Sequence, residues 1–537
     1  MSTLTGANFI GPRESREGRV LFRAQDPTRG TDLDPELVEA TPGEVDAAVR
    51  AAEGAFEAYG AIPAPGRASF LHALATQIEA LGDGLLERAE AETALPRPRL
   101  TGERGRTANQ ARLFADVVDE GSWVDARIDR AQPDRQPLPR PDVRRMLVPL
   151  GPVAVFGASN FPLAFSVAGG DTVSALAAGC PVVVKAHPAH PGTSELVARA
   201  ILAAADETGM PPGVFSMVHG PSPEVGQALV ASPAIQAVGF TGSFRGGKAL
   251  FDAAARRAQP IPVFAEMGSA NPVFVLPGAL AIRGAEIAEA LAASVTLGCG
   301  QFCSSPGRVF LPEGAEAEAF LDELGGRLGG APAGTMVHAG IKAAYDADLK
   351  EVASLPGVEL AARATARGSH ADTEAQAALL VVDRSDWASQ PRLGEEVYGP
   401  ATMAVRCESP EAFIESARTL RGHLTATVHA TEEDLAAQPG LLDVLRGKAG
   451  RVLVGGVPTG VEVSPAMHHG GPWPATTDSR ATSVGTAAIL RFARPVCLQN
   501  VPDPALPEEL RDSNPRGLWR LVDGRPTREP LEPAVPR

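Results

Sequence analysis

Residues 235–257, IQAVGFTGSFRGGKALFDAAARR, decide the fold class of this chain. The apolar run at 235–240 predicts a buried strand, a glycine-rich turn follows, and residues 246–257 have the composition of a helix. A short apolar strand that leads through such a turn into a helix is typical of parallel sheets with crossover helices. We therefore expect an α/β protein.

The same alternation continues outward along the chain. We expect strands at 153–156, 182–184, 214–218 and 271–276, and helices at 165–179, 193–207, 223–231 and 284–297. Further helices are expected at 43–60, 67–93 and 103–119, and a second α/β stretch from 308 to 460. A late strand at 486–492 and a hairpin at 521–527 complete the predicted elements.

The composition is that of a globular protein with a large core. The chain has 537 residues, of which 44% are hydrophobic and 21% charged. A net charge of −15 repels phosphate backbones and anionic membrane surfaces, so we expect no nucleic-acid or membrane partner. The longest apolar run, 151–168, is broken by Gly157, Asn160 and Pro162, and no signal peptide is recognisable. We expect a cytoplasmic protein.

The five cysteines are too few and too scattered for a disulfide framework. A zinc site usually combines C-x2-C pairs or nearby histidines, whereas Cys299 and Cys303 are four apart and His468–His469 alone do not complete a site. We expect no metal. Three of the cysteines lie beside apolar residues and are expected to be buried thiols: Cys180, Cys407 and Cys497. Cys303 lies among small polar residues after a helix, where a thiol is either structural or an exposed nucleophile.

Five motifs in order resolve this choice. They are GASNFP at 157–162, GFTGS at 239–243, AEMGSANP at 265–272, GQFCSSPGR at 300–308 and EEVYGP at 395–400. From about residue 20 to 500 the chain resembles the aldehyde dehydrogenase family. The resemblance implies a Rossmann-like cofactor-binding domain (1–124 and 149–275), an α/β catalytic domain (276–465), a small β oligomerisation element (125–148 with 484–500) and a C-terminal extension (501–537). It also implies a homodimer or homotetramer.

The resemblance assigns the catalytic roles. Cys303 becomes the nucleophile that makes the aldehyde carbon tetrahedral, and the side-chain amide of Asn160 stabilises the oxyanion with the Cys303 backbone N–H. Glu266 becomes the general base that hydrolyses the resulting thioester. Its apolar setting, VFAEMG, predicts burial and a raised pKa.

The cofactor residues depart from the usual dinucleotide fingerprint, because no G-x-G-x-x-G follows the first strand. The turn GFTGS instead presents Gly239, Thr241, Gly242 and Ser243 to a pyrophosphate at a helix N-terminus. Lys185 and His187 are expected near the adenine ribose. NAD-preferring relatives often carry Glu where this chain has Pro188, so we expect NADP, with NAD as the alternative. Glu396 and Tyr398 are expected at the nicotinamide ribose and ring.

The substrate prediction rests on two further segments. Residues 185–198 and 472–497 resemble the branch that oxidises 2,5-dioxopentanoate (α-ketoglutarate semialdehyde) to 2-oxoglutarate, and WRLVDG at 519–524 agrees. A substrate carboxylate favours an arginine partner, for which Arg106 and Arg480 are candidates, together with Gln110. Phe161 and Phe165 are expected to line the tunnel. The alternatives are an NADP-dependent fatty or other aliphatic aldehyde dehydrogenase, a cofactor-independent thiol esterase and a catalytically silent binding protein.

Overall fold

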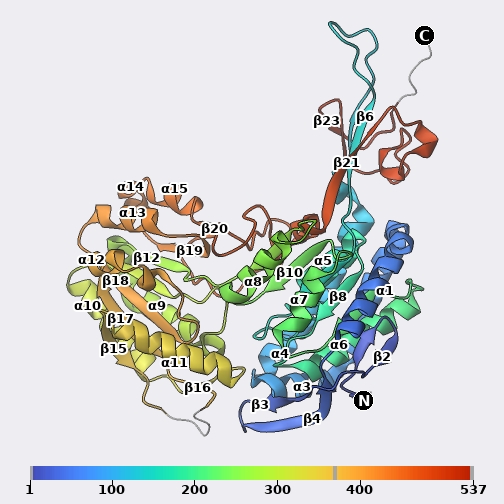
Figure 1. The fold of residues 1–537 in the computed structure, drawn as a ribbon. Coiled ribbons are helices and arrows are strands. Elements are labelled where there is room, and N and C mark those ends of the chain that lie inside the picture. The colour runs from blue at the N-terminus through green and yellow to red at the C-terminus, as the bar shows by residue number, and fades with distance from the viewer. Residues whose placement is uncertain (1–3, 367–371, 532–537) are drawn as a thin grey trace.

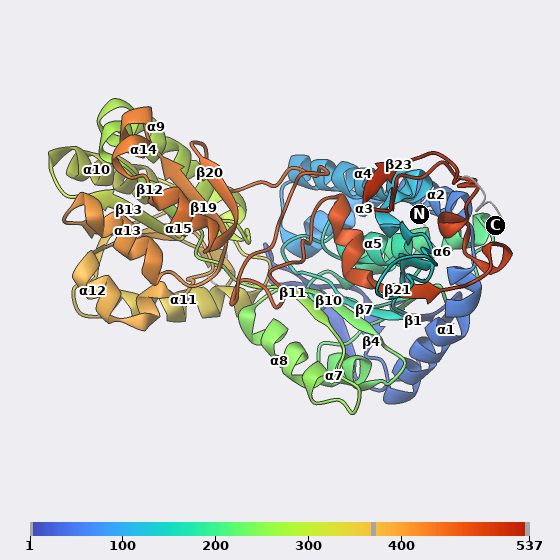
Figure 2. The ribbon, with the colours of Figure 1, turned by 90° about the horizontal axis from the view of Figure 1, so that it is seen from above.

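The computed structural model describes residues 4–366 and 372–531. Two large sheets with helices on their faces form two lobes, and a narrow third sheet projects from the lobe that contains the N-terminus (Figures 1 and 2). The prediction of an α/β protein with parallel sheets is confirmed. In the part of the chain that the structure describes, no helix has both the length and the apolar character needed to cross a membrane.

The first sheet has seven strands. Their order is β11 (Val263–Glu266), β10 (Ala237–Thr241), β7 (Val153–Phe156), β8 (Val182–Lys185), β9 (Phe215–Val218), β1 (Asn8–Ile10) and β2 (Arg13–Ser15). The first five are parallel, while β1 and β2 are antiparallel additions at one edge. The carboxyl ends of the parallel strands therefore meet at one side of the sheet, where Thr241 and Glu266 lie in register.

Among the described residues, eight helices belong to this lobe. They are α1 (Pro42–Gly60), α2 (Ala64–Ala80), α3 (Gly82–Thr93), α4 (Arg97–Glu120), α5 (Gly170–Ala178), α6 (Pro191–Glu207), α7 (Pro223–Ala231) and α8 (Phe244–Ala255). The single helix predicted at 67–93 is two helices, because Gly82 adopts a φ of 58° and starts a new axis. A two-stranded ribbon, β3 (Leu21–Asp26) and β4 (Thr31–Val38), lies beside α3.

The second sheet also has seven strands. Their order is β15 (Glu359–Arg363), β17 (Ala378–Asp383), β18 (Ala401–Cys407), β13 (Arg308–Pro312), β12 (Pro272–Val275), β19 (His423–His429) and β20 (Ala449–Val454). Of the strands that the structure describes here, β15 alone is antiparallel. The strand predicted at 271–276 was grouped with the first series, but β12 pairs with β13 and β19 of this sheet.

The helices of the second lobe are α9 (Pro277–Thr296), α10 (Ala315–Gly329), α11 (Ala339–Ala353), α12 (Arg384–Ser389), α13 (Pro410–Thr419), α14 (Glu432–Ala437) and α15 (Leu441–Arg446). A two-stranded pair, β14 (Gly334–Thr335) and β16 (Glu374–Ala375), lies at its margin. Short 3₁₀ helices complete the chain at Ser122–Val124, Leu297–Gly300, Pro391–Gly394, Thr486–Phe492, Asp503–Ala505 and Glu508–Leu510.

The third sheet joins distant segments in the order β21 (Ala493–Gln499), β6 (Val143–Pro149), β5 (Arg127–Asp129), β22 (Arg520–Val522) and β23 (Arg525–Thr527). The predicted hairpin at 521–527 is confirmed. The predicted strand at 486–492 is wrong: these residues form the 3₁₀ helix η4, and the strand begins at Ala493. Buried Ala488, Ile489 and Phe492 follow a helical rather than an alternating spacing, which explains the difference.

Candidate active site

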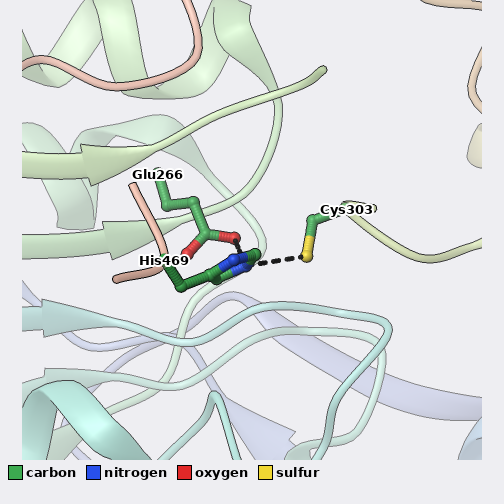
Figure 3. A group of neighbouring side chains, drawn as sticks. All are labelled: Glu266, Cys303 and His469. Atoms are coloured by element: carbon green, nitrogen blue, oxygen red, sulfur yellow. Dashed lines mark hydrogen bonds and ion pairs between the residues drawn. The ribbon is translucent and has the colours of Figure 1, made fainter. Parts of the chain in front are cut away.

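Three side chains from separate parts of the fold meet between the lobes (Figure 3). Glu266 ends β11, Cys303 lies in the loop before β13, and His469 lies in the long segment that follows β20. Nε2 of His469 is 3.4 Å from Sγ of Cys303 and 3.2 Å from Oε1 of Glu266. His469 and Glu266 are buried and Cys303 is half-buried. A thiol, an imidazole and a carboxylate thus share one small volume.

The carboxylate of Glu266 is ionised more readily than the sequence suggested. Burial by itself raises its pKa, but His469, the hydroxyl of Ser483, which donates to Oε2, and the Cys303 thiol together lower it below the usual value. The prediction of a raised pKa for Glu266 is therefore wrong. An apolar sequence neighbourhood did not reveal the polar partners that arrive from residues 469 and 483.

The Cys303 thiol has the opposite tendency. Burial raises its pKa well above the usual value, and the nearby carboxylates of Glu266 and Glu396 raise it further, while Arg106 acts in the other direction. The thiol therefore rests in its protonated form. An attack by sulfur requires a proton acceptor at Sγ, and Nε2 of His469 is in position for this.

Asn271 fixes the loop that carries Cys303. Its Nδ2 donates to the carbonyl oxygens of Cys303 at 2.8 Å and Ser305 at 2.9 Å. Its Oδ1 accepts from the hydroxyls of Ser269 and Thr425, both at 2.9 Å. Ser269 replaces the commoner glycine of the AEMGSANP motif. Its hydroxyl fixes the side chain of Asn271, which in turn fixes the loop that carries Cys303.

Asn160 lies against the same loop. Its Nδ2 donates to the carbonyl oxygen of Gln301 at 2.8 Å, and the residue is buried. A side-chain amide carries two N–H groups, so one remains for an oxyanion. The loop after Asn160 is supported by the buried carboxylate of Glu103, which accepts from the backbone N–H groups of Leu163 and Ala164.

One face of α4 presents two predicted substrate residues. Arg99, Glu103, Arg106 and Gln110 follow a four-three-four spacing that aligns them along the helix. Nη1 of Arg106 donates to the carbonyl of Val461 at 3.1 Å. Its buried Nε and Nη2, and Nε2 of Gln110, have no hydrogen-bond partner among the described residues. The charge of Arg106 acts on both Cys303 and Glu266.

Aromatic rings form the neighbouring wall. The ring of Phe161 lies 5.2 Å from that of Phe165 and 5.3 Å from that of Phe302, edge to face in both pairs. The guanidinium of Arg99 lies 4.7 Å from the ring centres of both Phe161 and Phe302, and that of Arg106 lies 5.4 Å from Phe165. Cationic and aromatic groups therefore alternate beside the thiol.

Arg480, the other predicted carboxylate partner, does not point into this site. Its side chain is 88% exposed and ion-paired with Asp478 at 2.7 Å. The two residues form a local surface pair, which sequence reasoning could not distinguish from an inward-pointing arginine.

The glycine-rich turn at Gly239, Thr241, Gly242 and Ser243 fits a pyrophosphate. Ser243 caps α8 by accepting from the backbone N–H of Gly246 at 3.2 Å, and Gly242 and Ser243 are exposed. A Cβ on Gly242 would lie 2.7 Å from the ring of Phe240, so this close turn requires glycine. The open helix N-terminus suits an anion.

Lys185 and His187 lie at the end of β8 and just beyond it. Burial lowers the pKa of Lys185 to about 8, and the carboxylate of Glu39 acts against that decrease. Burial, the His190 ring and the charge of Lys185 lower the pKa of His187, which leaves the imidazole neutral. The cation at this position is therefore Lys185, with the carboxylate of Glu39 nearby.

Glu396 and Tyr398 lie close enough to the thiol for their charges to interact with it. Burial raises the pKa of Glu396 to about 8, although Arg308 and the backbone N–H of Ser269 act in the opposite direction. Its carboxylate packs so closely on Gly268 that a Cβ there would lie 2.1 Å from Oε2. Burial, Glu396 and Cys303 raise the pKa of Tyr398 well above its usual value, so the phenol is neutral.

Comparisons with known proteins agree with this architecture. The model of the aldehyde dehydrogenase family matches residues 15–471, and the chain belongs to that family. It is 52% identical to the alpha-ketoglutaric semialdehyde dehydrogenase 2 of Azospirillum brasilense, over 97% of this chain and 99% of that one. It is 46% identical to the alpha-ketoglutaric semialdehyde dehydrogenase of Acinetobacter baylyi, over 98% and 99%.

Among solved structures, betaine aldehyde dehydrogenase of Staphylococcus aureus in complex with NAD+ has a TM-score of 0.79 at 19% identity, covering 93% of this chain and 96% of that one. This likeness confirms the aldehyde dehydrogenase fold. The protein is an oxidoreductase of the aldehyde dehydrogenase class.

Sequence reasoning missed His469, Asn271, Phe302 and Arg99. Phe302 lies in the motif GQFCSSPGR and Asn271 in AEMGSANP, but the sequence does not show what their side chains contact. Arg99 lies two turns before Arg106 on the same helical face. The pair His468–His469 alone does not complete a metal site in the sequence, and the partners of His469 are 166 and 203 residues away.

Proposed function

We propose that this protein oxidises 2,5-dioxopentanoate to 2-oxoglutarate with NADP as the hydride acceptor. The names of the two relatives at 52% and 46% identity support the substrate. The observation that carries the proposal is the meeting of Cys303, His469 and Glu266 beside the unpartnered N–H groups of Arg106.

Formation of the covalent adduct begins at Cys303. As Sγ bonds to the aldehyde carbon, Nε2 of His469 takes the thiol proton, and the carbonyl oxygen becomes an oxyanion. The free N–H of Asn160 and the backbone N–H of Cys303 stabilise that oxyanion. A bound nicotinamide cofactor would accept the hydride from the adduct, which leaves a thioester on Cys303.

Hydrolysis of the thioester relies on Glu266. Its lowered pKa keeps the carboxylate ionised near neutral pH, where it removes a proton from the attacking water. A pocket of about 20 Å³ is lined by Glu266 and in part by His469, Thr482 and Ser483. This volume is large enough for one water, which these polar side chains would bind. The product leaves as a free carboxylate.

The contacts of His469 argue against the thiol esterase alternative. In a catalytic triad the acid orients one ring nitrogen while the other nitrogen activates the nucleophile. Here Cys303 and Glu266 both approach Nε2, while the buried Nδ1 has no hydrogen-bond partner among the described residues. His469 therefore passes one proton between thiol and carboxylate instead of acting as an oriented triad base.

Recognition of the substrate carboxylate is assigned to Arg106, with Gln110 beside it. A guanidinium with two buried, unpartnered nitrogens is incomplete without an acceptor, and a carboxylate supplies two oxygens. Phe161 and Phe165 enclose the short carbon chain. A long aliphatic substrate would leave these N–H groups unsatisfied.

Preference for NADP rests on Lys185, since Pro188 places no acid at that position. A 2′-phosphate beside the ammonium gains a charge-assisted bond. Glu39 reduces this attraction, so the proposed preference is partial and NAD remains usable. Gly239 to Ser243 receive the pyrophosphate, and Glu396 and Tyr398 receive the nicotinamide ribose and ring.

Assembly is proposed through the third sheet, whose strand β21 pairs on one side only among residues 4–366 and 372–531. An unpaired strand edge is a template for another chain, and pairing would give the homodimer or homotetramer expected from the sequence.

The test compares kcat/KM for 2,5-dioxopentanoate, succinic semialdehyde and decanal, each with NADP and NAD. We expect the dicarbonyl acid with NADP to be the best pair. Arg106→Leu should lower kcat/KM for this acid by about 100-fold, the cost of an unpaired substrate charge. It should lower kcat/KM for decanal much less, through the loss of its charge near Cys303 alone. Arg480→Leu is the matched control and should behave as the parent. Equal losses for the acid and for decanal, or decanal as the best substrate, would contradict the proposal.

A further inference from the structure

The triangle of catalytic side chains has the dimensions of a metal site. Zinc bonds of about 2.3 Å to sulfur and about 2.0 Å to nitrogen or oxygen, at tetrahedral angles, place ligand atoms about 3.3 to 3.6 Å apart. The two measured separations at His469 are 3.4 Å to Sγ of Cys303 and 3.2 Å to Oε1 of Glu266. All three ligand atoms lie within 4.8 Å of one another.

The ligand chemistry selects one class of cation. A thiolate, an imidazole nitrogen and a carboxylate suit borderline ions such as Zn²⁺, whereas Mg²⁺ and Ca²⁺ prefer oxygen alone. The anionic thiolate and carboxylate balance the two charges of the ion. Apart from its ion pair with His469, the buried Oε1 of Glu266 has no hydrogen-bond partner among the described residues.

We propose that Cys303, His469 and Glu266 form a reversible inhibitory site for a thiophilic divalent cation of the zinc type. As the metal–sulfur bond forms, the Cys303 thiol releases its proton to solvent, and a water occupies the fourth position. The ion coordinates the nucleophile, its proton acceptor and the hydrolytic base at the same time, so none of the three can take part in catalysis. It competes with the aldehyde, because a sulfur bound to an acyl group is no longer a thiolate ligand.

The experiment uses metal-free full-length protein titrated with Co²⁺, whose thiolate charge-transfer and tetrahedral ligand-field bands report the coordination directly. We expect one Co²⁺ per chain, displaced by Zn²⁺ and not by Mg²⁺, and inhibition by Zn²⁺ that a chelator reverses. Cys303→Ser should abolish the thiolate band. His469→Asn and Glu266→Gln should each weaken Co²⁺ binding by more than about tenfold.

Cys497→Ser is the control. The prediction that this thiol is buried is wrong, because Cys497 lies on an exposed position of β21, and it is remote in sequence from the triangle. The substitution should leave both the spectrum and the activity unchanged. The inference is overturned if Cys497→Ser removes the bands, or if His469→Asn and Glu266→Gln both bind Co²⁺ as tightly as the parent. The inference reuses the proposed catalytic residues, but the spectrum is independent of catalysis. Bands without dehydrogenase activity would contradict the proposed function alone, and activity without bands would contradict the metal site alone.

Discussion

At the scale of single residues, the site combines groups whose pKa values are shifted apart. Burial and carboxylates keep the Cys303 thiol protonated, while partners from residues 469 and 483 keep Glu266 ionised. A nucleophile and a base with these tendencies need a group between them that moves the proton, and His469 occupies that position.

Replacing His469 tests this role. His469→Phe keeps an aromatic ring in the buried space but removes the proton acceptor at Sγ. We expect kcat/KM for the aldehyde to fall by about 100-fold, a typical loss for one acid–base group. The rate of Cys303 alkylation by iodoacetamide should fall in parallel, while KM for NADP should not change. An alkylation rate equal to that of the parent would show that the thiol is activated elsewhere.

Glu396 makes a pH-dependent prediction. Its pKa of about 8, raised by burial and by Asp348 and opposed by Arg308, leaves it mostly protonated at pH 7. Ribose hydroxyls that donate to this carboxyl favour its ionised form, so NADP binding should lower the pKa and release most of one proton at pH 7. The release should fade as the pH rises above about 8. Calorimetry in buffers of different ionisation enthalpy measures it.

Glu396→Gln is the control for that experiment, since the amide cannot release a proton. If the variant and the parent release the same number of protons on binding NADP, Glu396 is not the group that titrates.

At the scale of elements, the sequence predicted the helices and strands better than the residues that meet in the active site. Strand–turn–helix units such as 235–257 were readable because apolar runs and glycines are local signals. Cys303, Glu266 and Asn160 were found through motifs. His469 was not found in this way, because its partners, Glu266 at the end of β11 and Cys303 in the loop before β13, are distant in sequence. Its position depends on tertiary packing of a segment with no regular structure. The mistaken strand at 486–492 has a different reason: its buried residues follow a helical spacing and pack as a 3₁₀ helix.

The element η4 is held by a buried ion pair. Nη1 of Arg491 lies 2.7 Å from Oδ1 of Asp171 on α5, and both side chains are at most 10% exposed. Asp171→Asn removes the charge and leaves a buried guanidinium unpaired, so the free energy of unfolding should fall by about 3 kcal/mol. Urea denaturation measures the loss. Asp478→Asn, which breaks the exposed pair with Arg480, should change stability by less than about 1 kcal/mol. Equal losses in the two variants would contradict the structural role of η4.

At the scale of the whole molecule, the third sheet depends on the last part of the chain. β22 lies between β5 and β23, and Leu506, Leu510 and Leu518 pack in the cluster that buries Ile128. A chain that ends at residue 499 would lack β22 and expose Ile128. We expect such a chain to lose the oligomeric state of the parent and to melt at a lower temperature, as measured by analytical ultracentrifugation and calorimetry. If the shortened chain forms an oligomer with the same number of subunits as the parent, residues 500–537 are dispensable for association.

The strand order of this sheet also has a consequence for biosynthesis. β5 and β6 are synthesised early, but their neighbours β21 and β22 emerge hundreds of residues later. On the ribosome, the apolar face around Ile128 and Met146 therefore stays exposed to solvent for most of translation. This interval makes the nascent chain, rather than the finished enzyme, the species most exposed to aggregation, and chaperones that bind exposed apolar strands would act there.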